Sequence, residues 1–128
     1  MTSTAWHAAD RGDLVAFLEA GFACAQACSD CARVCAGRVS FAGPGEAGVG
    51  QELRRQAVLC TEVCDATCAM LSEQAHQDEY GMRIQVEWCR AMCLECAHVS
   101  DRYEGAQDCA AACRDCARAC TDFLAILG

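Results

Sequence analysis

The sequence has a single proline, Pro44, and only ten basic residues against eighteen acidic ones in a chain of 128. The resulting net charge of −8 argues against a nucleic-acid partner, which selects for clustered Lys and Arg. No apolar run approaches the length of a membrane span, so we expect no membrane partner. No segment alternates apolar and polar residues through β-branched runs, which leaves no sign of a β-strand. These absences favour an all-α protein of one domain, residues 1–128.

The N-terminus, MTSTAWHAADRGD, lacks the basic region and apolar stretch of a secretory signal. We therefore expect a cytoplasmic protein. Thiols in that compartment are normally kept reduced, so dense cysteine there indicates metal binding or catalysis rather than disulfides.

Cysteine, by contrast, is abundant: the chain has fourteen, and they lie in four short blocks. The first and last blocks, CAQACSDCARVC and CAAACRDCARAC, are identical at nine of twelve positions. The four blocks are Cys24 to Cys35, Cys60 to Cys68, Cys89 to Cys96, and Cys109 to Cys120. Such repetition predicts that each block contributes the same kind of face to one common structure.

Glycine-containing breakers separate the blocks: FAGPGEAGVG, HQDEYGM and SDRYEG. The segments between them are rich in good helix formers, which predicts an antiparallel up-down-up-down four-helix bundle. A short additional N-terminal helix near Trp6, capped by Ser3 or Thr4, is compatible with the pattern. The predicted helices span residues 13–40, 51–78, 82–103 and 106–126.

Within the blocks, cysteines recur in steps of four and three, the period of one helix face. Charged residues such as Arg33 and Arg114 fall on the opposite face. The second block steps four and four, so its stripe drifts around the helix, and in the third block Ser100 stands where a fourth thiol would come. The pattern predicts a bundle whose interior is lined with thiols.

A lone buried cysteine is usually a small core residue, but four converging stripes are not explained in that way. Neighbouring thiols on one helix have nearly parallel Cα–Cβ vectors, which suits disulfide closure badly. Metal binding remains, and Cu(I) fits best because it is soft, selects thiolates and accepts two or three ligands. Each bound Cu(I) would cancel one buried thiolate, so we expect binding to release about one proton per cysteine.

Three other functions use some of the same residue types. Sequestration of Zn, Cd or Ag is the main alternative, because thiol spacing distinguishes soft metals poorly. A thiol redox enzyme would need an exposed thiol of low pKa, whereas these face inward. A di-iron enzyme would use the Glu-x-x-His pairs Glu73/His76 and Glu95/His98, but both pairs lie on the outer face. We therefore expect a protein that is not an enzyme.

The blocks CAQACSDCARVC, CTEVCDATC, CRAMCLEC and CAAACRDCARAC resemble those of the cysteine-lined four-helix-bundle copper storage proteins. The resemblance runs from about Leu14 to the C-terminus and is closest to the cytosolic branch. It implies a homotetramer of bundles, each holding many Cu(I) ions, with copper donor and acceptor proteins unknown. Ser100 and Leu71 occupy inner positions where further thiols could stand. The predicted copper ligands are Cys24, Cys28, Cys31, Cys35, Cys60, Cys64, Cys68, Cys89, Cys93, Cys96, Cys109, Cys113, Cys116 and Cys120.

The two ends of the predicted bundle differ. One end is expected to be closed by apolar side chains, namely Phe17, Leu71, Met82 and Phe123. The other end is built from Ser100, Ala57, Ala106 and the loops near Gly43 and Asp101, and is smaller and more polar. We expect copper to be taken up there. His98 either hands the ion on or, as its helical angle favours, points away from the core. Met82 points inward near Cys89 and is either core filler or a thioether ligand.

Overall fold

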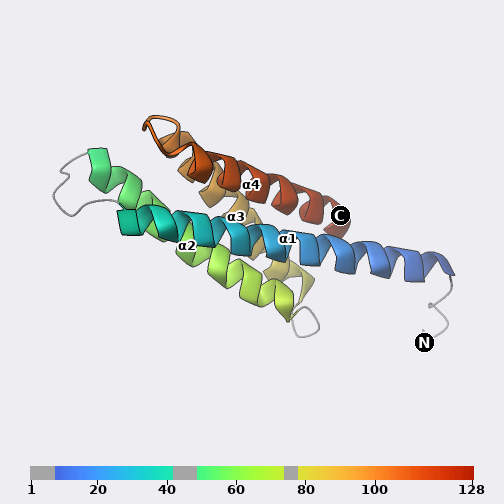
Figure 1. Cartoon of the computed structure of the whole chain (residues 1–128). Coiled ribbons are helices and arrows are strands. Elements are labelled where there is room, and N and C mark those ends of the chain that lie inside the picture. Colours follow the sequence, from blue (N-terminus) through green and yellow to red (C-terminus); the bar gives the residue numbers. More distant parts are fainter. Residues whose placement is uncertain (1–7, 42–48, 74–77) are drawn as a thin grey trace.

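The computed structural model describes residues 8–41, 49–73 and 78–128, and these form a four-helix bundle (Figure 1). The helices are α1 (Ala8–Phe41), α2 (Val49–Ser72), α3 (Glu79–Ser100) and α4 (Gln107–Leu127). Each helix packs against the next in sequence, and α4 packs against α1 to close the ring. The described residues contain no strand. The predicted all-α fold class is confirmed.

The helix bounds differ from the predicted ones at several helix ends. The second helix ends at Ser72 rather than near residue 78, and the third begins at Glu79 rather than 82. The reason lies in Asp78, whose carboxylate caps α3 by accepting from the backbone N–H of Gly81. Gly81 therefore belongs to the first turn of the helix and does not break it. The third helix also ends earlier, at Ser100, and Asp101 is its C-cap residue.

The first helix begins at Ala8, before the predicted start at 13, and continues through Gly12. The additional helix expected near Trp6, with Ser3 or Thr4 as its cap, lies outside the described residues. So do the loop around Gly43 and the side chain of His76.

Cysteine forms most of the bundle interior. Thirteen of the fourteen cysteines have no exposed surface, and larger apolar side chains gather toward one end of the same core, among them Leu71, Val86 and Phe123. Arg33, Arg114 and Arg118 are exposed, as the outer-face prediction requires. A smaller apolar cluster of Leu53, Val99 and Ala106 lies beside the α3–α4 turn.

One described segment, Leu14–Gly37 in α1, is long and apolar enough to cross a membrane by length and composition. The expectation that no such run exists was therefore wrong. Alanine and cysteine supply much of its hydropathy. Its four cysteines are buried against the other helices, whereas Leu14, Leu18 and Phe22 in the same segment are exposed.

Candidate metal centre

The sulfur atoms meet across helices more closely than along them. Cys35 in α1 and Cys109 in α4 are 3.4 Å apart, and Cys64 in α2 and Cys93 in α3 are 3.5 Å apart. Within one helix, by contrast, Cys31 and Cys35 are 4.0 Å apart. All fourteen cysteines are free thiols. The antiparallel arrangement thus turns four separate stripes into one continuous array.

Twelve of the thiols form four overlapping groups, each with four sulfur atoms within 4.8 Å of one another. Cys31, Cys35, Cys113 and Cys116 each belong to two groups, so neighbouring groups share ligands. With a metal–thiolate bond of about 2.3 Å, as for zinc, the sulfurs of a trigonal site lie about 4.0 Å apart. The array can therefore hold metal with little movement. From one end to the other, the groups are Cys28/Cys89/Cys116/Cys120, Cys31/Cys64/Cys93/Cys116, Cys31/Cys35/Cys60/Cys113 and Cys35/Cys96/Cys109/Cys113.

Two predicted ligands lie outside these groups. Cys24 extends the array by one step, with its sulfur 3.7 Å from that of Cys120. Cys68 is only partly buried, packs against the core, and belongs to none of the four groups. At about 100° per residue, Cys68 lies about 80° around the helix from Cys60, whereas Thr67 lies within about 20° of it. Thr67 accordingly takes the inner position and is fully buried.

Mutual hydrogen bonding divides the thiols into two kinds. Interaction with Cys120 lowers the pKa of Cys24 to about 5, and interaction with Cys116 raises the pKa of Cys28 far above its usual range. In the same way, Cys113 raises the pKa of Cys93 and lowers that of Cys31. Some thiolates are thus stabilised by thiols that stay protonated. An incoming soft cation would displace those remaining protons.

Large side chains close one end of the array, which we call the aromatic end: Phe17, Leu71, Met82 and Phe123. The rings of Phe17 and Phe123 meet edge to face with centroids 5.6 Å apart. Leu71 and Phe123 are fully buried, and Met82 is nearly so. The Thr67 hydroxyl near this end donates to the carbonyl of Val63 and accepts from the amide of Gln85. The predicted apolar closure is confirmed.

Small side chains form the other end, which we call the serine end: Ala57, Ser100 and Ala106. All three are buried beside the last group of thiols. The Ser100 hydroxyl has no hydrogen-bond partner in residues 8–41, 49–73 and 78–128. Hydrogen bonding from Cys113 holds the pKa of Cys109 well below its usual range.

The α3–α4 turn covers the serine end. Tyr103 donates to a carboxylate oxygen of Glu52 at 2.9 Å, and Arg102 pairs with the same oxygen at 3.1 Å. Gly105 has a positive φ of 89°, which glycine adopts most easily. In this conformation the serine end is covered by small side chains and a short turn, rather than being open to water.

The remaining sequence candidates are placed as follows. His98 is exposed, as its helical angle predicted, and Met82 lies in the core, which leaves both roles expected for Met82 open. Glu73 and Glu95 are exposed on different helices and take no part in any described cluster of metal-binding side chains. The geometry gives the described members of the two Glu-x-x-His pairs no common site.

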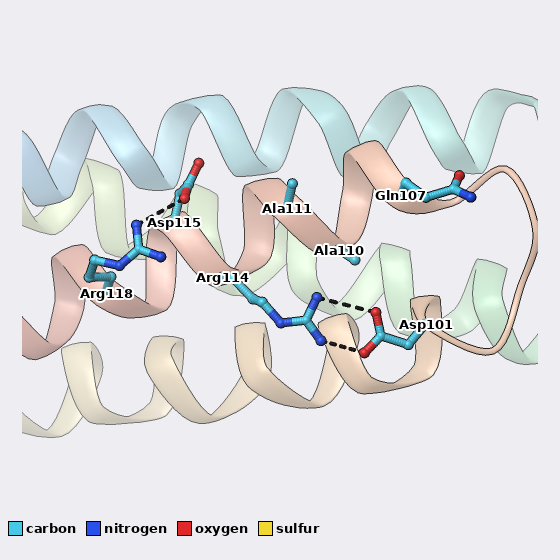
Figure 2. A pocket seen from close by; sticks show the side chains of 7 residues that line it. All are labelled: Asp101, Gln107, Ala110, Ala111, Arg114, Asp115 and Arg118. Carbon is cyan, nitrogen blue, oxygen red and sulfur yellow. Dashed lines mark hydrogen bonds and ion pairs between the residues drawn. The ribbon is translucent and has the colours of Figure 1, made fainter.

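A surface groove lies beside the serine end but does not reach the thiols (Figure 2). Its lining includes Asp101 and Arg114, which form a bidentate ion pair between the end of α3 and α4. The Arg114 guanidinium keeps the pKa of Asp101 below its ordinary value. Asp115 and Arg118 pair farther along α4. No cysteine lines this groove, so its charges serve the surface rather than the metal site.

Comparison with known proteins gives consistent matches. The family model described as copper storage protein matches residues 10–125. A structure of copper loading to a cytosolic copper storage protein from Streptomyces lividans, with five coppers, is 30% identical with a TM-score of 0.78. That match covers 85% of this chain and 95% of the other. No curated protein sequence matches the chain.

Two further structures of the Streptomyces lividans protein match. A mutant with one histidine changed to alanine is 32% identical, with a TM-score of 0.78, covering 86% of this chain and 96% of the other. The protein loaded with 10 copper equivalents is 32% identical, with a TM-score of 0.58, covering 91% and 86%.

Proposed function

This chain belongs to the copper storage protein family, and we propose that it stores Cu(I) on the cysteines lining its bundle. The observation that carries the proposal is the set of four overlapping groups of buried thiols, which share ligands from one group to the next. A delivery protein needs one accessible site for quick transfer. A buried array with shared ligands suits retention of many ions, and the family's storage role is not a catalytic one.

Cu(I) suits this site for two reasons. Thiolates are soft ligands, which Cu(I) prefers over the oxygen ligands that hard cations require. Each monovalent ion also cancels the charge of one thiolate. A core filled with Cu(I) therefore stays close to neutral inside a water-poor bundle. Zn(II) at each four-thiolate group would leave a net negative charge buried.

An anaerobic titration tests the proposal. The reduced protein is titrated with Cu(I) against a chromophoric chelator while helix content is followed by circular dichroism. We expect more than ten tightly held copper ions per chain, since roughly one Cu(I) can be held per shared thiolate. Helix content should be present before copper is added. Binding of only one or two ions would contradict storage.

The alternative is general sequestration of soft metals. The same titration with Zn(II), Cd(II) and Ag(I), followed by competition with Cu(I), separates the two functions. Storage of copper predicts that Cu(I) displaces Zn(II) and Cd(II) from the array. Retention of Zn(II) in the presence of equimolar Cu(I) would favour the alternative.

We propose that the chain is cytoplasmic and acts as a homotetramer. The relative from Streptomyces lividans is described as cytosolic. Two stripes of exposed apolar side chains support assembly: Leu14, Leu18 and Phe22 on α1, and Tyr80, Ile84 and Trp88 on α3. Analytical ultracentrifugation of the variants Phe22→Glu and Trp88→Glu tests this. We expect smaller species than the unsubstituted chain, and unchanged sedimentation would contradict it.

We also propose that copper is taken up at the serine end. Ala57, Ser100 and Ala106 present little bulk between the outside and the last thiol group. At the aromatic end, Phe123 and Leu71 would have to move. The turn held by Tyr103 and Glu52 would open to admit the ion.

A further inference from the structure

A single carboxylate joins the α3–α4 turn to the start of α2. One oxygen of Glu52, in the first turn of α2, accepts from the Tyr103 phenol at 2.9 Å and pairs with Arg102 at 3.1 Å. Both donors lie in the turn, 50 and 51 residues away from Glu52 in the sequence. We call Glu52, Arg102 and Tyr103 the Glu52 latch.

The turn that this latch holds connects two ligands of the last thiol group. Cys96 lies in the final turns of α3 and Cys109 in the first turn of α4, on either side of the turn. The Tyr103 ring packs with a small apolar cluster from α2, α3 and the turn, made of Leu53, Val99 and Ala106. An ion that approaches these thiols between α2 and the turn therefore needs the turn to move away from α2.

The contacts of the latch are of a kind that can break without unfolding a helix. The side chains of Arg102 and Glu52 are about half exposed, and an ion pair in such a position contributes little to stability. Partial burial and the Glu52 carboxylate raise the pKa of Tyr103, so the phenol stays a hydrogen-bond donor at neutral pH. The turn should therefore open at a lower free-energy cost than the bundle as a whole.

We propose that the Glu52 latch controls how fast copper enters and leaves the serine end, and not how tightly copper is held. Only chains whose turn is open exchange the ion, so the rate is reduced by the fraction of chains that are open. No latch residue belongs to a thiol group, so breaking the latch changes uptake and release by the same factor. This inference rests on the proposed storage function and on uptake at the serine end.

Two substitutions weaken the latch to different degrees. Tyr103→Phe removes one hydroxyl and keeps the packed ring, whereas Glu52→Ala removes the acceptor of both contacts. We expect uptake and release both to accelerate, roughly threefold in Tyr103→Phe and roughly tenfold in Glu52→Ala. Stopped-flow transfer from a chromophoric Cu(I) complex measures uptake, and removal by excess chelator measures release. Equilibrium affinity and capacity should be unchanged in both variants.

Asp115→Asn provides the matched control. The Asp115 carboxylate pairs with Arg118 at the same distance of 3.1 Å, but both residues lie in α4 and hold no turn. This variant loses one negative charge, as Glu52→Ala does, so it accounts for any change in the attraction of the copper complex to the protein. Its rates of uptake and release should equal those of the unsubstituted chain.

Alkylation of the copper-free, reduced protein tests the latch without copper. Iodoacetamide labelling, located by peptide mass spectrometry, should become faster at Cys109 in Glu52→Ala and stay unchanged at Cys24, near the aromatic end. Equal acceleration at both cysteines would indicate general loosening of the bundle and would overturn the inference. So would unchanged copper rates in Glu52→Ala, or a loss of equilibrium affinity that accounts for faster release.

The two kinds of failure are distinguishable. Little copper bound by the unsubstituted chain would contradict the storage proposal, and with it any role of the latch in copper exchange. Full copper capacity, together with unchanged alkylation of Cys109 in Glu52→Ala, would overturn the latch alone.

Discussion

The two ends of the thiol array contain the same ligand but are closed in opposite ways. At the aromatic end, Phe123 and Leu71 fill the space, and the buried Thr67 hydroxyl is fully hydrogen-bonded. At the serine end, Ala57 and Ala106 leave little bulk, and the buried Ser100 hydroxyl has no partner in the described residues. One end is therefore filled by large apolar side chains beside a satisfied hydroxyl, and the other has small side chains beside a buried hydroxyl without a partner in the described residues.

With copper uptake at the serine end, as we propose, stability and uptake would fall at opposite ends of the bundle. A core lined with cysteine offers less apolar area than one lined with leucine, so part of the stability has to come from beyond the thiols. The aromatic end provides apolar area of this kind at the opposite end of the array from the proposed uptake site. Four substitutions or conditions test the separation, beginning with the largest expected effect.

Phe123→Ala should cost the most stability of any single change at either end. Removing a fully buried phenylalanine leaves a cavity and lowers the free energy of unfolding by about 3–5 kcal/mol. Urea denaturation of the reduced, copper-free protein measures the change. The comparison predicts no such loss for Ser100→Ala under the same conditions. A loss below about 1 kcal/mol for Phe123→Ala would remove the distinction between the ends.

Ser100→Phe should slow copper uptake while leaving capacity nearly intact. The added ring fills the serine end, and an added barrier of about 1.4 kcal/mol would slow uptake roughly tenfold. Stopped-flow transfer from a chromophoric Cu(I) complex measures the rate.

Val86→Phe is the matched control, because Val86 is fully buried near the aromatic end and suffers similar overpacking. Its uptake rate should match that of the unsubstituted chain. Equal slowing in both variants would place uptake elsewhere.

The pH dependence of copper binding should be the same at both ends of the array. Each end has one thiol of lowered pKa and one of raised pKa: Cys24 and Cys120 at one end, Cys109 and Cys96 at the other. Cys24, with a pKa of about 5, is ionised at pH 7 and releases no proton there, whereas Cys120 is protonated and must release one. Copper binding should weaken as pH falls, roughly tenfold per pH unit for each proton displaced.

The number of protons released on copper loading at pH 7 shows how many thiols are still protonated before copper binds. The double variants Cys24→Ala/Cys120→Ala and Cys96→Ala/Cys109→Ala should each release about one proton fewer than the unsubstituted chain. The total number of protons released by the unsubstituted chain should then be smaller than the one proton per cysteine expected from sequence alone. A release of fourteen protons would show that every thiol is neutral before loading.

Cys68→Ser should have the smallest effect of any cysteine substitution. Cys68 is partly exposed and lies outside the groups of thiols, whereas Cys64, one turn away, is fully buried within one. Titration with Cu(I) should show nearly full capacity for Cys68→Ser and a loss of about one ion for Cys64→Ser, at roughly one ion per thiolate. Equal losses would make Cys68 a full member of the array.

Much of the site could be predicted from spacing alone. Steps of four and three put Cys24, Cys28, Cys31 and Cys35 on one face, and all four are buried. The same reasoning put Cys68 with the other ligands, although two steps of four drift away from the axis and leave Cys68 only partly buried, and it passed over Thr67. A seven-residue step from Cys60 would have found Thr67, since seven residues nearly complete two helical turns. The capping role of Asp78 was also missed, and with it the start of α3.

The sequence by itself determined that this chain is helical, that each helix has an inward stripe of sulfur, and that the two ends differ in bulk. These properties depend on local periodicity and side-chain size, which a single helix already fixes. Only the tertiary structure decided which thiols meet, pairing Cys35 with Cys109 and Cys64 with Cys93 across helices. It also decided that Ser100 lacks a partner while Thr67 has two. The register between antiparallel helices sets these distances, and the register arises only when the bundle packs.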